Sequence, residues 1–460
     1  MRVLIISPHF PPTNAADMQR VRLILPYLKE HGVIADVISV ESEQVSSPQD
    51  PWLELCLPKE IQIHRVKALS LKWALLPGLG TLGFRAIRAL ARAGDALLGK
   101  NNLTEDSCPF DLVYFSTTVF PVHVLGPRWK KKFGVPFVMD YQDPWVSDYY
   151  RDHPNVLPPG GRLKYAVANW LNRRQEPQVL RECSGITSVS AAYPEQLAKR
   201  YPWLRMEVVG IGEEKINNQQ STIVNRQSLL SLLLPFPGDA RDFERVKSEN
   251  IQQSVFNPND GLKHWVYVGR GGADMTVAVR ALFSVLQSTL HSQPSTLNSL
   301  RLHFIGTSYA AAGQGVKLLE PLAAEYGLST IVHESTDRIP YSETLRCLLD
   351  ADALIIPGSD DPGYTASKIY PYLLAEKPLL AIFHEESSVI ELIRKVGGGK
   401  VISFATGESP DSIAARINSE WRVSNGSNQA VPLDHAAFAH YSARSQAEKL
   451  IDFWKTCLNS

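Results

Sequence analysis

One stretch decides how the second half of the chain is read: LIIPGSDDPGYTASKIYPYLLAEKPLL, residues 354–380. Its first four residues are apolar and are followed by turn residues, which is typical of a buried strand end. Residues 357–363 contain two Pro, two Gly, one Ser and two Asp, a composition that indicates a loop. A helix is predicted to begin near Ser367 and to end at Lys377-Pro378, before the next apolar strand. The stretch therefore predicts a strand, a loop and a helix in succession.

The loop in this stretch suits an anion. The beginning of a helix presents free backbone N–H groups and the positive end of the helix dipole. Lys368 adds a full charge in the predicted first turn, so a diphosphate is the expected kind of ligand. The alternative is an ordinary connection between a strand and a helix, in which a Ser caps the helix.

Length and composition indicate a two-domain globular protein. The chain has 460 residues, which favours two domains of roughly 200 residues each. Lys plus Arg and Asp plus Glu both number 47, so no overall charge favours nucleic acid as a partner. The five cysteines are scattered, so neither a zinc site nor a disulfide framework is predicted. The apolar first residues are interrupted by Pro8, Pro11 and Pro12, too early for a signal or spanning segment, and we expect a cytoplasmic protein.

Strand and helix patterns alternate along most of the chain. Residues 3–7, 14–30 and 33–40 predict a strand, a helix and a second strand, which indicates a parallel sheet. On this basis we predict an N-terminal Rossmann-like domain (1–212), a linker or insertion (213–262), a C-terminal Rossmann-like domain (263–430) and a terminal helix that crosses back to the N-terminal domain (431–460).

Polar residues at predicted strand ends are the candidates for chemistry, because ligands of such sheets bind beyond the carboxyl ends of the strands. Asp143 precedes Pro-Trp, so its carboxylate can project into a cleft; the alternative is that it caps the turn. Arg270 is flanked by Gly269, Gly271 and Gly272, which allow close approach to an anion. Its alternative is a solvated arginine on a turn. The histidines show no metal-ligand spacing, and His9 stands alone.

A basic helix is predicted within the first domain. Residues 84–98 carry Arg85, Arg88 and Arg92 on one polar side, and Lys130, Lys131 and Lys132 follow in a later helix. An ordinary surface helix would explain the first pattern. The functional interpretation is an interfacial helix that docks on anionic lipid.

Several motifs, taken together in order and spacing, resemble the glycosyltransferases of the GT-B fold, and among them the retaining enzymes of family 4. They are RVLIISPHFPP (2–12), PFVMDYQDPW (136–145), ITSVS (186–190), YVGR (267–270) and SKIYPYLLAEKP (367–378). The similarity covers nearly the whole chain apart from roughly 213–260. It implies two doubly wound α/β domains that face each other across a cleft, with a nucleotide-sugar donor bound mainly by the second domain and the acceptor mainly by the first.

The resemblance also implies roles for particular residues. Arg270, with Gly271 beside it, matches the basic residue that contacts the donor diphosphate, and the backbone of Ala366, Ser367 and Lys368 matches the helix start beneath it. Asn14 and Ala15 stand in the acceptor-side loop, where the family has a pair of glycines.

The sequence departs from the family at other positions. The family's paired glutamates fall on Gly363 and Pro371, and a Lys expected shortly after Arg270 is absent. Asp360 or Asp361 could replace the glutamate that contacts the sugar.

These observations predict a transferase that moves a hexose, with retention, from a nucleotide-sugar to an acceptor hydroxyl, in polysaccharide or glycolipid biosynthesis. Asp143 is the predicted catalytic residue. No metal or cofactor is expected, and the acceptor is a glycan or a lipid-linked glycan, reached at the inner face of the membrane. Two other classes stay open: a GT-B protein without transferase activity that serves as a binding partner, and a nucleotide-sugar epimerase.

Overall fold

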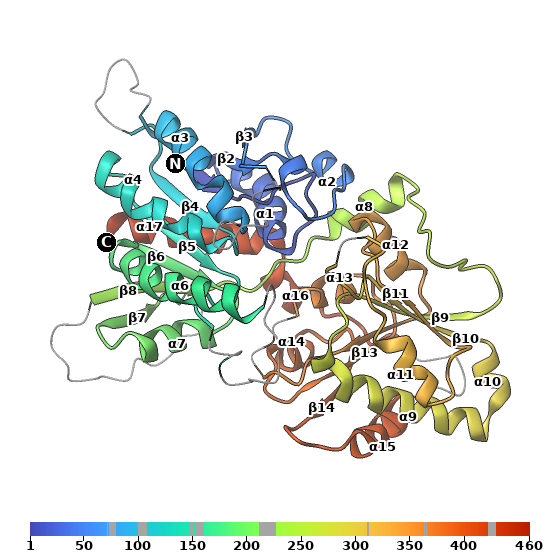
Figure 1. Cartoon of the computed structure of the whole chain (residues 1–460). Coiled ribbons are helices and arrows are strands. Elements are labelled where there is room, and N and C mark those ends of the chain that lie inside the picture. The colour runs from blue at the N-terminus through green and yellow to red at the C-terminus, as the bar shows by residue number, and fades with distance from the viewer. Residues whose placement is uncertain are drawn as a thin grey trace. The chain divides into compact units, whose positions relative to one another are not determined.

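The structure, a computed structural model, describes all residues except 71, 73–79, 100–107, 148–150, 152–160, 211–226, 311, 363, 365 and 422–428. The chain forms two compact units (Figure 1). The N-terminal unit comprises Met1–Pro237 together with Ala443–Ser460, and the C-terminal unit comprises Gly238–Ser442.

The N-terminal unit is built on a parallel sheet of eight strands in its described residues, in the order β3-β2-β1-β4-β5-β6-β8-β7. The strands are β1 Arg2–Ile6, β2 Ile34–Val40, β3 Gln62–Val66, β4 Leu112–Ser116, β5 Phe137–Tyr141, β6 Gly185–Ser188, β7 Leu204–Val208 and β8 Gln227–Leu233. The helices are η1 Ala16–Met18, α1 Gln19–Glu30, η2 Ser42–Gln44, α2 Trp52–Leu55, α3 Leu82–Leu98, η4 Phe120–Val124, α4 Leu125–Phe133, α6 Arg162–Glu182, α7 Ala192–Arg200 and α17 Ala443–Asn459.

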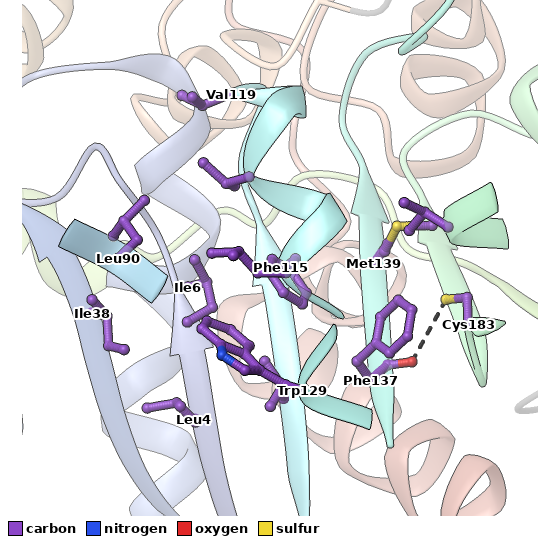
Figure 2. Close-up of a cluster of buried hydrophobic side chains, with 14 of the residues drawn as sticks. Leu4, Ile6, Ile38, Leu90, Phe115, Val119, Trp129, Phe137, Met139 and Cys183 are labelled. Carbon is purple, nitrogen blue, oxygen red and sulfur yellow. Dashed lines mark hydrogen bonds between the residues drawn. The ribbon is translucent and has the colours of Figure 1, made fainter. Parts of the chain in front are cut away.

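Both faces of this sheet are covered by apolar side chains. Successive residues of a strand point to opposite faces, so Leu4 of β1 joins one buried cluster and Val3 joins the other. Figure 2 shows the first cluster, in which the rings of Phe115 and Trp129 stack 6.0 Å apart and Phe137 meets Phe115 edge-on. A strand that is buried on both faces consists of a nearly continuous run of apolar residues, and such runs are easy to recognise in the sequence. This explains why these strands were predicted well.

The terminal helix α17 covers the opposite face beside α1 (Figure 1). Its Trp454 is fully buried and meets the ring of Tyr114 edge-on, with centroids 5.1 Å apart. Arg444 pairs with Glu30 of α1 at 2.5 Å. The last helix therefore completes the core of the first unit, although it is separated from that unit by the whole second one in sequence.

The C-terminal unit is built on a second parallel sheet, with six strands in its described residues in the order β11-β10-β9-β12-β13-β14. The strands are β9 Lys263–Val268, β10 Leu300–Ile305, β11 Val332–Ser335, β12 Ala353–Pro357, β13 Leu379–His384 and β14 Lys400–Phe404. The helices are α8 Ala240–Ser248, η5 Ala273–Met275, α9 Thr276–Ser292, α10 Pro294–Asn298, α11 Leu319–Glu325, α12 Tyr341–Asp350, α13 Ile369–Leu374, α14 Ser388–Val396, α15 Pro410–Glu420, α16 His435–Phe438 and η6 Ala439–Tyr441.

The predicted domain boundaries need correction at two points. Residues 213–262 are not simply a linker: β8 inserts between β6 and β7 of the first sheet, and α8 belongs to the second unit. The apolar run around Leu230 is a strand because it pairs with Gly185–Ser188 on one side. The return to the first unit occurs at Ala443 and not at 431, because α16 and η6 stay with the second unit.

Candidate functional site

Each sheet has a strand order that marks one point for ligand binding. In the first sheet β1 lies between β2 and β4, and in the second β9 lies between β10 and β12. In both cases the chain continues to one side of the central strand and later returns to its other side. Ligands of open parallel sheets bind beyond the carboxyl ends of the strands at this reversal. We call the two places the β1/β4 site and the β9/β12 site.

In the β9/β12 site, Arg270 follows β9 and is held by Asp274. Its Nη1 and Nη2 atoms donate to the two carboxylate oxygens of Asp274 at 2.9 and 2.7 Å. Its guanidinium lies over the ring of Tyr364, 4.7 Å from the centroid. Burial alone would lower the pKa of Arg270, but the contacts with Asp274 raise it overall. A Cβ on Gly272 would lie 2.2 Å from Asp274 Oδ1, so this pair needs a glycine there. Arg270 is thus fixed in place and not simply solvated.

Lys368 reaches the same point from the loop after β12. Its Nζ donates to Tyr267 Oη at 2.7 Å, and Tyr267 Oη donates to the carbonyl of Arg270 at 2.8 Å. A Cβ on Gly269 would lie 2.1 Å from Nζ, so the amine occupies space that the glycine leaves open. The structure therefore joins Arg270 and Lys368, which the sequence selected from separate strand ends. The tyrosine that links them was missed, because within β9 it looks like an ordinary core residue.

The cluster of Arg270, Asp274 and Lys368 holds two cations and one carboxylate. Within the described residues Lys368 contacts no carboxylate. Burial, followed by the charge of Arg270, lowers the pKa of Lys368 to about 7. A bound anion favours the charged form of a nearby amine. The cluster is therefore suited to an anion such as a diphosphate.

The helix after this loop is shorter than predicted. It begins at Ile369, with Lys368 as its N-cap, close to the predicted start near Ser367, but it ends at Leu374, before the predicted end at Lys377-Pro378. A six-residue helix aligns few peptide dipoles, so the charge of Lys368 is the stronger attraction for an anion. Pro371 lies inside it and supplies no N–H group.

The remaining residues predicted to bind the donor occupy varied positions. The N–H group of Gly271 donates to the carbonyl of Thr307 at 2.8 Å and is therefore not available to a ligand. Ala366 is buried, Ser367 is half-buried, and Asp361 is exposed in the loop. Gly363, which stands where the family has a glutamate, lies outside the described residues.

In the β1/β4 site, His9 follows β1 and pairs with Asp17 of η1. His9 Nδ1 lies 2.9 and 3.0 Å from the two carboxylate oxygens of Asp17. Oδ2 of Asp17 also accepts from Thr117 Oγ1 at 2.9 Å and from the N–H group of Thr118 at 3.1 Å, both after β4. Burial alone would lower the pKa of His9 and raise that of Asp17, but their mutual attraction raises the first and lowers the second overall.

The description of His9 as isolated is therefore wrong. Its partner lies eight positions along the chain, beyond a Pro-rich loop whose path the sequence did not reveal. His9 and Asp17 could both have been found in the sequence as polar residues that follow a central strand of the sheet.

Asp143 lies in the loop after β5, exposed and close enough to Asp17 to be affected by its charge. Crowding by the surrounding protein, followed by the charge of Asp17, raises the pKa of Asp143 to about 6. Its carboxylate makes no hydrogen bond or ion pair within the described residues, so no turn cap is seen. Asp140, three residues earlier, is different: it is fully buried, pairs with Arg20 at 2.7 Å and accepts from Thr187 at 2.8 Å. Asp140 is structural, whereas Asp143 is available for chemistry.

The two residues predicted in the acceptor-side loop do not face solvent. Asn14 and Ala15 are both 7 % exposed, and the N–H group of Asn14 donates to the carbonyl of Pro48 at 2.7 Å. The surface of this loop is contributed by Ala16, which is exposed, and by the half-buried His9 and Pro12. Within the described residues no group of three or more His, Cys, Asp or Glu side chains is arranged to hold a metal ion.

The basic helix α3 borders a groove. The groove has a volume of about 430 Å³ and is lined by Ile87, Arg88, Ala91 and Arg92 of α3 and by Val124, Leu125 and Arg128 of η4 and α4. Arg85 does not belong to it: this side chain is 4 % exposed and donates to the carbonyls of Gln44 and Leu69. Its predicted place on the polar side of the helix is therefore wrong, because the backbone carbonyls of Gln44 in η2 and of Leu69 hold the guanidinium inside.

The predicted run of lysines is mostly paired. Lys130 bonds the carbonyl of Glu182 and Lys132 bonds Asp95, while Lys131 is exposed. No helix in the described part of the chain has the length and apolarity needed to cross a membrane.

Solved structures with the same fold cover nearly the whole chain. HepE from Anabaena, in complex with UDP and glucose, aligns with a TM-score of 0.57 at 13% identity over 98% of this chain and 99% of that one. A UDP-forming α,α-trehalose-phosphate synthase from Burkholderia xenovorans aligns with a TM-score of 0.58 at 12% identity, over 99% and 98%. WaaG, a glycosyltransferase involved in lipopolysaccharide biosynthesis, aligns with a TM-score of 0.50 at 14% identity, over 99% and 95%.

No protein-family model and no curated protein matches the sequence. Identities this low establish architecture and leave membership of family 4 open. Two parallel-sheet α/β units, each with a central reversal of strand order, together with these end-to-end alignments, identify the fold: the chain has the GT-B fold.

Proposed function

We propose that this protein is a glycosyltransferase that binds the diphosphate of a nucleotide-sugar at the β9/β12 site and transfers the sugar to an acceptor hydroxyl. The observation that carries the proposal is Lys368, a half-buried amine that contacts no carboxylate within the described residues and lies beside Arg270. Two cations fixed before the ligand arrives stabilise the negative charge that develops on a leaving diphosphate, and such electrostatic stabilisation is usually the largest catalytic contribution.

The similar structures support this assignment. HepE was solved with UDP-glucose as well as with UDP and glucose, and the trehalose-phosphate synthase forms UDP. A UDP-sugar is therefore the first donor to test. The resemblance to family 4 further implies retention of the anomeric configuration, which the anomeric coupling constant of the product measures.

The test is isothermal titration calorimetry with UDP, GDP and ADP, and with uridine, guanosine and adenosine as controls without phosphate. We expect one diphosphate to bind at least about 100-fold more tightly than its nucleoside, because two charge-assisted contacts are each worth about 1.5–3 kcal/mol. Equal affinity for the diphosphates and the nucleosides, or no binding at all, would reject the site.

A second function is favoured by one observation. An epimerase needs acid and base groups in its site, and the structure places His9, Asp17 and Asp143 near one another. Incubation of UDP-glucose without an acceptor separates the two functions: a transferase releases UDP, whereas an epimerase returns a changed nucleotide-sugar. Proton NMR of the mixture distinguishes these products.

We also propose that the N-terminal unit binds peripherally to an anionic membrane, where a lipid-linked acceptor would be found. The groove beside α3 supports this, because Arg88, Arg92 and Arg128 border an apolar floor. Arg128 is already paired with Asp95 at 2.5 Å, so Arg88 and Arg92 carry the proposal. Basic residues near an anionic surface contribute about 1 kcal/mol each.

Co-sedimentation with phosphatidylglycerol vesicles at low salt tests this contact. The double variant Arg88→Glu/Arg92→Glu should lose at least about 30-fold in partitioning, the equivalent of roughly 2 kcal/mol for the two residues. Lys199→Glu/Arg205→Glu makes the same charge change at exposed positions of α7 and β7 and serves as the control. Equal binding by the two variants would remove the groove from the proposal.

A further inference from the structure

We propose that Asp274 sets the charge of the β9/β12 site, so that the site accepts the diphosphate of a nucleotide-sugar but does not retain the more highly charged nucleoside diphosphate that is released. This inference rests on the proposed function and deepens it, because it concerns the choice between donor and product at the same site. All the residues that carry it belong to the C-terminal unit.

The first step of the argument is the charge of the two ligands. The diphosphate of a nucleotide-sugar is esterified at both ends, so each of its phosphates carries one negative charge. Once the sugar has left, the terminal phosphate is a monoester and loses a second proton with a pKa of about 6. At neutral pH the product therefore carries about one more negative charge than the donor. A site that only attracted anions would hold the product more tightly than the donor.

The second step is the position of the Asp274 carboxylate within the site. Its two oxygens accept from Arg270 at 2.9 and 2.7 Å, and the hydroxyl of Ser359, which follows β12, also donates to it. The N–H group of Asp360, in the same loop, donates to the backbone carbonyl of Asp274 at 2.8 Å. Burial alone would raise the pKa of Asp274, but the hydrogen bonds from Arg270 and Ser359 lower it overall. An ionised carboxylate is therefore fixed in the site from both strand ends.

The third step is what Arg270 has left for a ligand. A guanidinium has five N–H groups, and two of those of Arg270 donate to Asp274. The ring of Tyr364 covers one face of the guanidinium, 4.7 Å from the centroid to the guanidinium carbon. A Cβ on Gly272 would lie 2.8 Å from Nη1, so the pair also packs against the backbone. An anion must use the remaining N–H groups, with the carboxylate of Asp274 on the other side of the same small guanidinium.

The fourth step is the balance of charge. Burial, followed by the charge of Arg270, lowers the pKa of Lys368 to about 7, and the charge of Asp274 opposes this shift. The carboxylate thus acts on both cations of the site. Asp360 and Asp361 are exposed in the loop after β12, where water weakens their effect. Two cations still attract the donor, whereas the additional charge of the product meets the opposing charge of Asp274. In the proposed transferase this favours release of the product.

The experiment compares UDP with its β-methyl ester, which lacks one negative charge and gains a methyl group. The corresponding GDP and ADP pairs are run in parallel. Calorimetry in magnesium-free buffer at pH 7.5 gives both affinities for the parent and for Asp274→Asn, which keeps an oxygen for Arg270 and Ser359 but removes the charge. In the parent the two affinities should lie within about threefold of each other. In Asp274→Asn the preference for UDP over its ester should rise by about tenfold, as expected for one unit charge in a partly buried site.

Asp352→Asn is the matched control. Asp352 is also paired, with Lys263 at 2.8 Å, but it stands just before β12 begins, at the opposite end of that strand. The ratio of the two affinities should therefore keep its parent value in this variant.

The ratio separates the charge of Asp274 from a purely structural role. If Asp274 only positions Arg270, Asp274→Asn should weaken both ligands by the same factor, and the unchanged ratio would overturn the inference. A parent protein that binds UDP at least about tenfold more tightly than the ester would also overturn it, and this measurement needs no variant. If UDP binds better than uridine but the ratio stays unchanged in Asp274→Asn, only this inference fails. If no diphosphate and no ester binds to the parent, the proposed function fails as well.

Discussion

The β1/β4 site and the β9/β12 site hold the same place in two sheets but carry opposite chemistry. Each lies beside a central parallel strand, β1 or β9, that has a neighbour on either side. The chain first continues to one of these neighbours and later returns to form the other. The first presents His9 with the carboxylates of Asp17 and Asp143. The second presents Arg270 and Lys368 with the carboxylate of Asp274. One site is equipped to move protons and the other to hold an anion.

The difference shows that topology decides where chemistry can occur and that loop residues decide which chemistry it is. In the second unit the loop after β9 is rich in glycine, so the side chains of Asp274 and Lys368 lie directly against the backbone. In the first unit the loop after β1 is rich in proline, and its polar side chains bond one another and the threonines after β4. The predictions below test whether the two sites divide the work in this way.

The largest effect is expected for Asp143→Asn. Removal of this charge should lower the transfer rate about 10²–10⁴-fold, because a carboxylate beside the acceptor orients its hydroxyl or stabilises positive charge on the transferred sugar. Affinity for UDP should be unchanged, since donor binding is assigned to the other unit. Single-turnover transfer and calorimetry measure the two quantities. A transfer rate within a few-fold of the parent's would contradict this division of roles between the two sites. A loss of UDP affinity as large as the loss of rate would contradict it as well.

The complementary effect is expected for Arg270→Ala and Lys368→Ala. Each should weaken UDP binding by about 10–100-fold, since a hydrogen bond to a charged group contributes about 1.5–3 kcal/mol. Replacement of Arg270 should reduce UDP affinity less than replacement of an unpaired arginine would, because Asp274 already neutralises the charge of Arg270. Asp143→Asn is the matched control in the same titration. If Arg270→Ala and Lys368→Ala bound UDP as tightly as the control and the parent do, the β9/β12 site would not be the donor site.

The sequence predicted the fold well where burial dominates. Strands such as β1 and β12 are apolar on both faces, so their composition alone revealed them. The apolar face of the last helix also indicated a partner in the first domain, and α17 packs on α1. The sequence failed at β8, where a seven-residue run between polar segments gives no sign of the sheet that it joins. Its pairing is long-range, and local composition does not record it.

The candidate sites were predictable to the extent that strand ends converge. Lys368 and Arg270 meet because β9 and β12 are neighbours, as the resemblance implied. The Tyr267 bridge, the Asp274 partner and the His9–Asp17 pair were not predicted, because each depends on the path of a loop. The same limit applies to Arg85, whose guanidinium is held inside by the carbonyls of Gln44 in η2 and of Leu69.

The third prediction concerns pH and Lys368. Its pKa of about 7 in the free protein means that about half of the amines have already lost their charge at neutral pH. An anion binds the charged form, so affinity for UDP should level off about one pH unit below the pKa and should fall by up to about tenfold for each pH unit above it. Lys368→Arg should abolish this decline, since a guanidinium stays charged. A parent profile that is flat to pH 9 would show that Lys368 does not contact the diphosphate.

The smallest effect is expected for Gly269→Ala, and it tests how the β9/β12 site is built. The new Cβ would lie 2.1 Å from Lys368 Nζ and 2.9 Å from Tyr267 Oη, so the flexible end of Lys368 must move. The amine keeps its charge but leaves its position, and UDP affinity should fall only several-fold, less than in Lys368→Ala. The decisive measurement is the double-mutant cycle, because two residues in contact show an interaction energy that distant ones do not. In the Lys368→Ala background, Gly269→Ala should reduce UDP affinity less than it does in the parent, since the displaced amine is gone and only the contact with Tyr267 and the backbone remain. Any cost to the backbone itself would appear in both backgrounds and cancel. An equal loss in both would mean that Gly269 acts through the backbone, and that the placement of the amine against it does not matter for the diphosphate.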